Sequence, residues 1–379
     1  MISSTYPPDI GGVETHLHDL VSWVKQRKHK IVVVTFQPYK PSVSRMQVVE
    51  TEGNAITFRL PRPGRSVFFA NDRWNPVFQA FYLPTLLLFC VLYVSSHRKE
   101  IDVVHAHGIL STPIAFLVSK PFKKRCVMSL HHTYIPKGRV HKAVGRIILS
   151  LPDKVLCLSN KSRLELLRIG VQEEKLQTFT YWVDQTLFRP LDKDNCKKLL
   201  KFEERFVILF VGRLTEEKGV RVLLSVAKKL GDTLDNAIFA FVGIGPLAQE
   251  VIDASKHVRN VRFQGVVSNK DTPLWYNASD VLVVPSIHEE GFGRIILESL
   301  ACGTPVIAFN VGGVPEALDT SVGILAQPTA ESLTNAITYL YNNPDALMKL
   351  TEKCRPYAQK RFSEDNARLI EQAYFAYSK

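Results

Sequence analysis

The sequence predicts an α/β protein built from two doubly wound, Rossmann-like domains that face each other across a cleft. Short apolar runs rich in Val and Ile alternate with segments of helical periodicity along the chain, a pattern typical of βα units around a parallel sheet. The chain has 379 residues, more than one hydrophobic core usually serves. A polar stretch with a proline, residues 187–194, separates two such series. We therefore expect two domains.

The first domain is expected to occupy residues 1–185. Its apolar runs predict strands at residues 31–35, 102–105, 126–130 and 154–158. A first helix is indicated by apolar residues at helical spacing, namely Val13, Leu17, Leu20, Val21 and Val24. His16 lies on the same face, so we interpret it as a residue at the edge of the core. These elements predict one parallel sheet.

Residues 77–94 carry no charged side chain and precede the basic triplet 97–99. A bilayer-spanning helix needs roughly 20 apolar residues. This run is slightly shorter, and Gln79 and Pro84 interrupt it. We therefore expect a buried or interfacial helix rather than a transmembrane one.

The second domain is expected to occupy residues 186–359, with the linker residues at its start. Apolar runs predict strands at residues 206–211, 237–242, 261–263, 281–284 and 306–309. Helices are predicted at residues 218–230, 246–255, 293–301 and 331–342, and again at 363–377. Sheets of this kind bind ligands at the carboxyl ends of their strands. Asp192 and Asp194 form a D-x-D in the linker, which we interpret as unrelated to metal binding.

Composition and cysteine usage are those of a reduced globular protein. Apolar residues make up 46% and charged residues 22% of the chain, ordinary values for a globular domain. The six cysteines form no C-x-x-C pair, and Cys126, Cys157 and Cys302 lie in apolar runs. The first residues do not resemble a secretory signal peptide. We expect a cytoplasmic protein.

The basic charge is concentrated in the first half of the chain. Residues 1–189 hold 26 Lys and Arg against 13 Asp and Glu, whereas the whole chain has a net charge of +12. This asymmetry suggests an anionic partner for that half. No nucleic-acid motif accompanies it, so we expect an anionic membrane surface and no nucleic acid. The residues expected to contact the membrane are Lys123, Lys124, Arg125, Lys137 and Arg139.

The most informative motif is HEEGFGRIILESLACGTPV, residues 288–306. A buried strand ends before it, a glycine-rich turn contains Phe292 and Gly293, and a helix follows. Free backbone N–H groups at a helix start suit an anion or a polar ligand. Glu290 precedes this helix and Glu298 lies on its second turn, so both carboxylates are placed to accept hydrogen bonds from ligand hydroxyls. The ligand is therefore expected to combine phosphate with hydroxyl groups.

Two further turns follow predicted strands. In the string GRLTEEKG, residues 212–219, Arg213 leaves the strand and Lys218 precedes a helix. Two cations with free amides would bind a diphosphate and stabilise it as a leaving group. Gly243 and Gly245 form a similar strand-to-helix turn, a weaker signal because the full dinucleotide-binding motif is missing.

The first domain offers a glycine pair and a histidine pair. Gly12 follows Gly11 at the start of the first helix, where paired glycines let the backbone approach a ligand. His105 and His107 end a strand and point the same way, but no third ligand accompanies them, so we predict no metal site. His131 and His132 end the next strand.

These motifs together resemble the retaining nucleotide-sugar glycosyltransferases of family four, which have the GT-B fold. The resemblance covers Pro7–Glu14, residues 105–108, 211–219 and 288–316. It departs at the start, where the first strand is shortened, and at Tyr181-Trp182-Val183-Asp184, where family members more often carry Asn-Gly-Val-Asp. The resemblance also implies that a final helix, residues 360–379, packs back on the first domain.

The resemblance implies a role for each candidate residue. Arg213 and Lys218 would bind the diphosphate, Glu290 the sugar and Glu298 the ribose. Further groups would line the donor site, namely His107, Gly12, Gly243, Gly245 and the amides of Phe292 and Gly293. The two glutamates lie in one loop and helix, unlike the opposed pair of a double-displacement enzyme. A phosphate oxygen of the donor would then accept the acceptor's proton.

We therefore predict a metal-independent, retaining glycosyltransferase without a cofactor. It would move a hexose or N-acetylhexosamine from a nucleotide-diphosphate sugar to a lipid or lipid-linked glycan at the cytoplasmic membrane face, as a peripheral protein. A nucleotide-sugar epimerase and a non-catalytic nucleotide-sugar-binding protein are the alternatives. The sequence leaves the donor sugar, the base, the linkage and the oligomeric state open.

Overall fold

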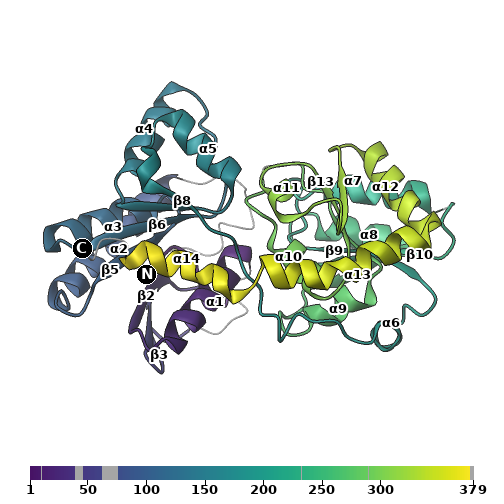
Figure 1. Ribbon diagram of the computed structural model, residues 1–379, viewed down its shortest axis with the longest axis horizontal. Coiled ribbons are helices and arrows are strands. Elements are labelled where there is room, and N and C mark those ends of the chain that lie inside the picture. Colours follow the sequence, from purple (N-terminus) through teal and green to yellow (C-terminus); the bar gives the residue numbers. More distant parts are fainter. Residues whose placement is uncertain (10, 39–45, 62–75, 232, 289, 376–379) are drawn as a thin grey trace. The chain divides into compact units, whose positions relative to one another are not determined.

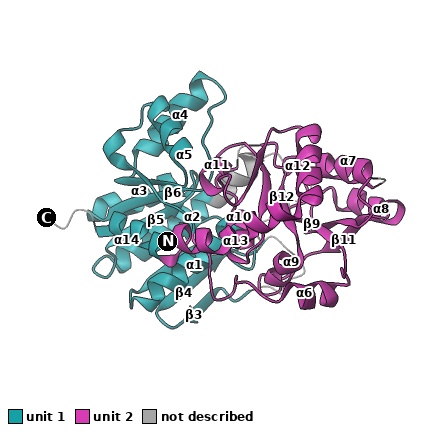
Figure 2. Ribbon diagram, turned by 45° about the vertical axis from the view of Figure 1, so that its right-hand side comes forward, with its two compact units in different colours: residues 1–181, 365–379 teal, residues 182–364 magenta. Residues whose placement is uncertain are grey.

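The computed structural model describes residues 1–9, 11–38, 46–61, 76–231, 233–288 and 290–375, without the side chains of 76–82. The last four residues of the predicted final helix thus lie outside the described residues. The chain forms two compact units, unit 1 from residues 1–181 and 365–379 and unit 2 from residues 182–364 (Figure 2). The domain limits predicted from the sequence were 185/186 and 359/360.

The described residues of unit 1 form an eight-stranded sheet in the order β3-β4-β2-β1-β5-β6-β7-β8, of which Figure 1 labels β2, β3, β5, β6 and β8. Its strands are β1 (Ile2–Ser3), β2 (Ile31–Phe36), β3 (Val49–Glu52), β4 (Ala55–Leu60), β5 (Val103–His107), β6 (Arg125–Leu130), β7 (Lys154–Cys157) and β8 (Leu176–Thr178). Its helices are α1 (Gly12–Gln26), α2 (Pro76–Ser96), α3 (Ser111–Ser119), α4 (Arg139–Ser150), α5 (Asn160–Ile169) and α14 (Ala367–Phe375). Only β3 is antiparallel to its neighbour. Apart from β3 and β8, the strands follow the nucleotide-binding order of a doubly wound sheet.

Unit 2 contains a six-stranded parallel sheet in the order β11-β10-β9-β12-β13-β14. Its strands are β9 (Phe206–Val211), β10 (Ala237–Val242), β11 (Val261–Gly265), β12 (Val281–Val284), β13 (Val306–Phe309) and β14 (Gly323–Ala326). Its helices are α6 (Lys193–Leu200), α7 (Val220–Leu230), α8 (Ala248–His257), α9 (Thr272–Ala278), α10 (Arg294–Ala301), α11 (Val314–Ala317), α12 (Ala330–Asn342) and α13 (Pro344–Arg361). The expected class, two Rossmann-like α/β halves, is confirmed.

The two-residue strand β1 lies near the centre of its sheet, between β2 and β5. Ile2 pairs with Val34 of β2 on one side and with Ala106 of β5 on the other. All three side chains belong to one buried cluster, to which α2 and α3 also contribute. Burial from both neighbours holds a strand of two residues where five would be usual for a strand.

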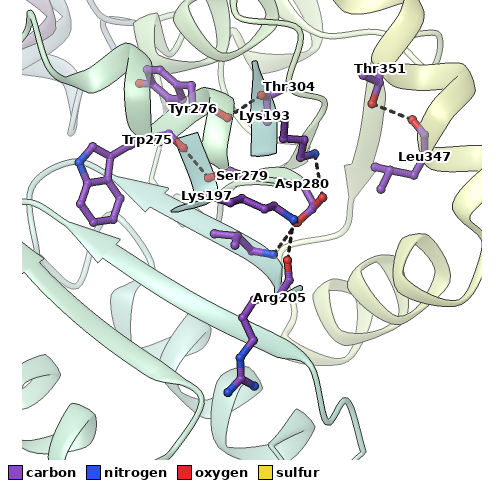
Figure 3. A network of polar contacts seen from close by, with 11 residues as sticks. Lys193, Lys197, Arg205, Trp275, Tyr276, Ser279, Asp280, Thr304, Leu347 and Thr351 are labelled. Carbon is purple, nitrogen blue, oxygen red and sulfur yellow. Dashed lines mark hydrogen bonds and ion pairs between the residues drawn. The ribbon is translucent and has the colours of Figure 1, made fainter. Parts of the chain in front are cut away.

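The stretch read as an interdomain linker is ordered within unit 2. Asp192 caps α6 by accepting a hydrogen bond from the amide of Asn195, which accounts for this residue of the D-x-D. Lys193 and Lys197 of α6 then pair with Asp280 at 2.7 and 2.8 Å (Figure 3). Asp280 also accepts the amide of Val207 at 2.7 Å. Because this carboxylate joins α6 to β9, Lys193 and Asp194, the last two residues of the predicted linker, lie in the first turn of a helix of unit 2.

The final helix of the chain packs on the first sheet. Helix α14 contacts β6 and β7, and Arg125 donates to the carbonyl of Ala373 at 2.6 Å. The amide side chain of Gln177 donates to the carbonyl of Leu369 at 2.8 Å. These bonds anchor α14 in unit 1.

Helix α2 coincides with the uncharged run at residues 77–94. Its described part buries Leu86, Cys90 and Val94 at a spacing of four, while Leu88 and Leu92 are exposed. It therefore packs one face on the sheet. None of the helices in the described residues combines the length and hydropathy needed to cross a bilayer.

Candidate functional site

The loops of the candidate site in unit 2 meet where the strand order reverses. From β9 the sheet continues through β10 and β11 on one side and through β12 to β14 on the other. The loops after β9 and β12 therefore leave adjacent strands at their carboxyl ends, the edge at which doubly wound sheets bind ligands. The first loop carries Arg213 and Lys218, and the second carries Glu290. The fold thus brings these three predicted residues to one place.

Lys218 and Glu290 form an ion pair between the two loops. Ser286 also donates to the same Glu290 carboxylate, at 2.6 Å. Burial alone would raise the pKa of Glu290, but Lys218, Ser286 and the nearby charge of Arg213 hold it below its usual value. Arg213 itself is exposed. The site therefore contains one ionised carboxylate beside two cations, one of them open to solvent.

The backbone fixes both loops against each other. Gly219 has a φ of +72°, and a Cβ there would lie 1.8 Å from the carbonyl oxygen of Pro285. The amide of Ile287 donates to the carbonyl of Glu217 at 3.0 Å. Only glycine permits this approach, so residue 219 determines how close Lys218 comes to the second loop.

A third loop, the turn after β13, contacts the backbone of Glu290. The amide of Gly313 donates to the Glu290 carbonyl at 2.8 Å. At Gly312, with a φ of +58°, a Cβ would lie 2.2 Å from that same carbonyl oxygen. The turn after β13 therefore holds the backbone of Glu290.

Gly243 and Gly245 lie in the turn after β10, next to the Arg213 loop. The amide of Leu214 donates to the carbonyl of Ile244 at 3.0 Å, and the amide of Leu247 donates back to Leu214 at 2.9 Å. A Cβ at Gly243 would lie 1.8 Å from the carbonyl oxygen of Gly212. The glycines of this turn therefore permit close packing of the two loops, while direct contact with a nucleotide stays a prediction.

Phe292 and Gly293 end the second loop. Gly293 is the N-cap residue of α10, so the free amides expected at a helix start are present there. The ring of Phe292 is buried and packs edge-on against Phe362, with centroids 6.0 Å apart. Its side chain therefore anchors the loop, which leaves the backbone as the group available for a ligand.

Glu298 lies in a buried polar network. One carboxylate oxygen accepts from Arg294 at 3.0 Å and the other from the hydroxyl of Tyr276 at 2.9 Å. Burial and the Glu298 charge raise the pKa of Tyr276 well above its usual value, so this hydroxyl stays protonated and donates. Glu298 thus joins Arg294 and Tyr276 in a structural network. Its contact with the ribose of a ligand stays a prediction.

In unit 1, Gly12 and His107 lie on the two loops at the corresponding reversal of strand order. Gly12 is the exposed first residue of α1, which follows β1, and His107 ends β5. β1 and β5 are neighbours in the sheet. The topology therefore places both residues near the carboxyl edge of these two strands.

His107 belongs to a buried cluster of histidine and tyrosine side chains. Its Nδ1 lies 3.2 Å from Nε2 of His131, whose Nδ1 lies 2.8 Å from the hydroxyl of Tyr181. The ring of His16 is 4.4 Å from that of Tyr181. His16 is fully buried, and it lies inside the core rather than at its edge.

His105 lies beside this line of rings. Its nitrogens contact the hydroxyls of Tyr374, at 2.7 Å, and Ser129, at 2.9 Å. Within the described residues no group of three His, Cys, Asp or Glu side chains is arranged to bind a metal. Independence from metal stays a prediction.

Several residues of these networks were not singled out from the sequence. Tyr276 lies outside the motifs and contacts Glu298 from 22 positions away in the sequence. Ser286 lies four residues before Glu290, but a single serine at that spacing is no motif. Arg294 does lie four residues before Glu298, the spacing at which helical side chains meet. Tyr181 was noted as an unusual residue, and the structure places its hydroxyl on His131.

Two family models match the chain. Residues 10–186 match the model described as Glycosyltransferase Family 4, and residues 192–361 match Glycosyl transferases group 1. Together they extend over both units. Similar curated proteins include the phosphatidylinositol N-acetylglucosaminyltransferase GPI3 subunit of Saccharomyces cerevisiae. It is 24% identical over 341 residues, which are 88% of this chain and 72% of the relative.

Solved structures share the fold. A sucrose-phosphate synthase from Thermosynechococcus elongatus matches with a TM-score of 0.80 and 22% identity, covering 98% of this chain and 97% of the other. Anabaena HepE, solved in complex with UDP, matches with a TM-score of 0.78 and 19% identity, covering 99% and 98%. At such identities the likeness concerns the fold alone.

Proposed function

This chain is a glycosyltransferase of the family-four type with the GT-B fold, and on this premise we propose that it retains the anomeric configuration and acts without a metal. It would transfer a hexose or N-acetylhexosamine from a nucleotide-diphosphate sugar to a lipid or lipid-linked glycan. The family matches favour a transferase over the epimerase and the non-catalytic binding protein considered from the sequence.

The observation that carries the proposal is the arrangement of Arg213, Lys218 and Glu290 at the strand-order reversal of unit 2. The departing diphosphate gains negative charge as the glycosidic bond breaks, and two cations at one edge of the sheet would stabilise that charge. Glu290 is kept ionised, so it is suited to accept hydrogen bonds from sugar hydroxyls. The free amides at the start of α10 would add donors to the same site.

Selective nucleotide binding tests the donor site. We expect one of UDP, GDP and ADP to raise the melting temperature and to give a calorimetric binding signal without added metal; UDP is tested first because it is bound in the Anabaena relative. Arg213→Ala should weaken that binding by about tenfold or more, since charge-assisted bonds to phosphate contribute about 1.5–3 kcal/mol.

Arg262→Ala is the matched control, because Arg262 is an exposed arginine of β11. It should bind the nucleotide as the original protein does. Equal loss in both variants, or no binding of any nucleotide by folded protein, would contradict the proposed donor site.

The acceptor is proposed to be membrane-borne, and one segment of unit 1 supports this. Residues 103–152 contain eight Lys and Arg and no Asp or Glu. Within this segment, α4 exposes Val140, Val144 and Ile147, at 78%, 46% and 63%, a spacing that places them on one helix face. An apolar row among cations is the composition of helices that lie in the interface of anionic membranes. The yeast relative's name, which includes phosphatidylinositol, is consistent with a lipid acceptor.

Arg125 was predicted from the sequence to contact the membrane, but its contact with α14 excludes it from the proposed surface. Its guanidinium donates to the carbonyl of Ala373 in α14, so its substitution would disturb packing. Lys123, Lys124, Lys137 and Arg139 remain in the proposal, joined by Lys142 of α4.

Vesicle binding tests the proposed surface. We expect the protein to sediment with phosphatidylcholine vesicles that contain phosphatidylglycerol, and Lys137→Glu with Lys142→Glu to weaken this at least tenfold, since each cation near the surface contributes about 1 kcal/mol. Val140→Ser with Ile147→Ser should weaken it as well. Leu199→Ser with Met348→Ser, two exposed apolar residues of unit 2, should change nothing. Unchanged binding in both α4 variants would refute the surface.

A further inference from the structure

A chain of two hydrogen bonds connects Tyr181 through His131 to His107, and in it each group donates to the next. It runs from the Tyr181 hydroxyl to Nδ1 of His131, and from Nε2 of His131 to Nδ1 of His107, over 2.8 and 3.2 Å. The far nitrogen of His107, Nε2, is buried and has no hydrogen-bond partner among the described residues. Buried polar atoms nearly always have partners, so this nitrogen is the open end of the hydrogen-bond chain.

Both imidazoles are neutral at physiological pH. Burial lowers the pKa of His131 to about 3 and, with the neighbouring histidines, holds the pKa of His107 well below its usual value. A neutral imidazole has one N–H and one bare nitrogen. Each ring in the hydrogen-bond chain must therefore donate through one nitrogen and accept through the other, so the two tautomers are coupled.

The Tyr181 hydroxyl determines which nitrogen of each imidazole carries the proton. A phenolic hydroxyl is a strong donor, and a bare imidazole nitrogen is a stronger acceptor than a phenolic oxygen. Tyr181 therefore favours donation to Nδ1 of His131, which places the His131 proton on Nε2. That proton is donated to Nδ1 of His107, and the His107 proton is left on Nε2. The hydrogen bond made by one ring nitrogen thus determines the state of the other.

We propose that Tyr181, acting through His131, fixes His107 as the Nε2–H tautomer, so that His107 presents a hydrogen-bond donor to an oxygen of a ligand at the carboxyl edge of β5. That contact rests on the proposed function, whereas the tautomer does not. Tyr181 and His131 are then positioning residues. Tyr181 stands where family members more often carry Asn, so this arrangement would be a feature of the present chain.

The neighbouring ring supplies a matched control. His105 is buried like His107, lies two residues earlier on β5, and its Nδ1 contacts the hydroxyl of Tyr374 at 2.7 Å. The two rings of β5 are tilted by 39° with centroids 4.0 Å apart, and the hydrogen bonds of His105 go to Tyr374 and Ser129. Tyr374→Phe therefore removes one phenolic hydroxyl from a buried histidine, as Tyr181→Phe does, without breaking the hydrogen-bond chain to His107.

The experiment is ¹⁵N NMR of the full chain with labelled histidine, which distinguishes a protonated from a bare ring nitrogen. His107→Gln assigns the signals of His107. We expect His107 to carry its proton on Nε2, to become a mixture of tautomers in Tyr181→Phe, and to be unchanged in Tyr374→Phe. Phenylalanine keeps the ring that packs against His16 and Phe179, and a thermal melt verifies folding.

A proton on Nδ1 of His107 in the original protein, or identical His107 signals in Tyr181→Phe, would overturn the proposal. Kinetics with the nucleotide sugar identified above test the link to transfer. Tyr181→Phe should lower kcat about tenfold, the effect of one net hydrogen bond, with the affinity for the free nucleotide unchanged. The NMR result holds even if no donor sugar is accepted, so failure of the proposed function and failure of the tautomer assignment are distinguishable.

Discussion

Lys218→Ala is expected to lower kcat by roughly a hundredfold to a thousandfold, the usual loss when one preorganised charge-stabilising group is removed from an active site. The leaving diphosphate would keep Arg213 but lose the cation that pairs with Glu290, the residue proposed to bind the sugar. Because the effect concerns charge that develops during bond cleavage, kcat should fall more than the affinity for the free nucleotide.

The same substitution should also shift the pH profile. Lys218 is the main group that lowers the pKa of Glu290 against its burial. Without it the pKa of Glu290 rises, so the carboxylate ionises only at higher pH. The acid limb of kcat/KM should therefore move upward in the residual activity of Lys218→Ala.

Lys229→Ala is the matched control, because Lys229 is an exposed lysine of α7. It should retain full activity. Near-normal turnover of Lys218→Ala, measured by release of the nucleoside diphosphate, would refute the role of this residue in leaving-group stabilisation.

Glu298→Ala is expected to lower the free energy of unfolding by about 3–5 kcal/mol. The change removes the carboxylate from a buried guanidinium, since the side chains of Arg294 and Glu298 are 5% and 8% exposed. It also removes the acceptor of the Tyr276 hydroxyl. Urea unfolding measures the loss. An unfolding free energy within about 1 kcal/mol of the original protein would show that the network is not structural.

A double variant separates structure from ligand binding. Arg294→Met with Glu298→Leu removes both charges, and replacing a whole buried pair by apolar side chains is often close to neutral. We expect most of the stability to return. If Glu298 also binds ribose, the double variant should be stable yet bind nucleotide more weakly. Equal instability of the single and double variants would argue against loss of the Arg294–Glu298 pair as the cause.

The sequence predicted the second sheet better than the first. Strands β9, β10, β12 and β13 begin and end at the predicted residues, because each is a continuous apolar run buried on both faces. Strands β3 and β4 were missed. β3 exposes three of its four residues, and β4 contains Thr57 and Arg59, so neither reads as an apolar run. The arginine is buried through its pair with Glu50 on β3, a contact between strands that no local pattern reveals.

In the candidate site, too, residues in local sequence motifs were predicted and residues that act through distant contacts were not. Arg213, Lys218 and Glu290 were predicted because each belongs to a local string, and the strand-order reversal places them together. Tyr276 and Tyr181 could not be predicted, because they contact Glu298 and His131 from 22 and 50 positions away in the sequence. Glu298 illustrates the difference, since the motif located it correctly but did not reveal its buried pairing with Arg294.

The chain leaves unit 1 at residue 181 and returns to it at residue 365, which affects the order in which the protein is completed during synthesis. Unit 2 is one continuous stretch of chain, so its strands leave the ribosome one after another with no segment of unit 1 between them. Unit 1 must wait for α14, which delivers the Ala373 carbonyl to Arg125 and the Tyr374 hydroxyl to His105. The histidine cluster is therefore completed last, after the loops that carry Lys218 and Glu290 have been made.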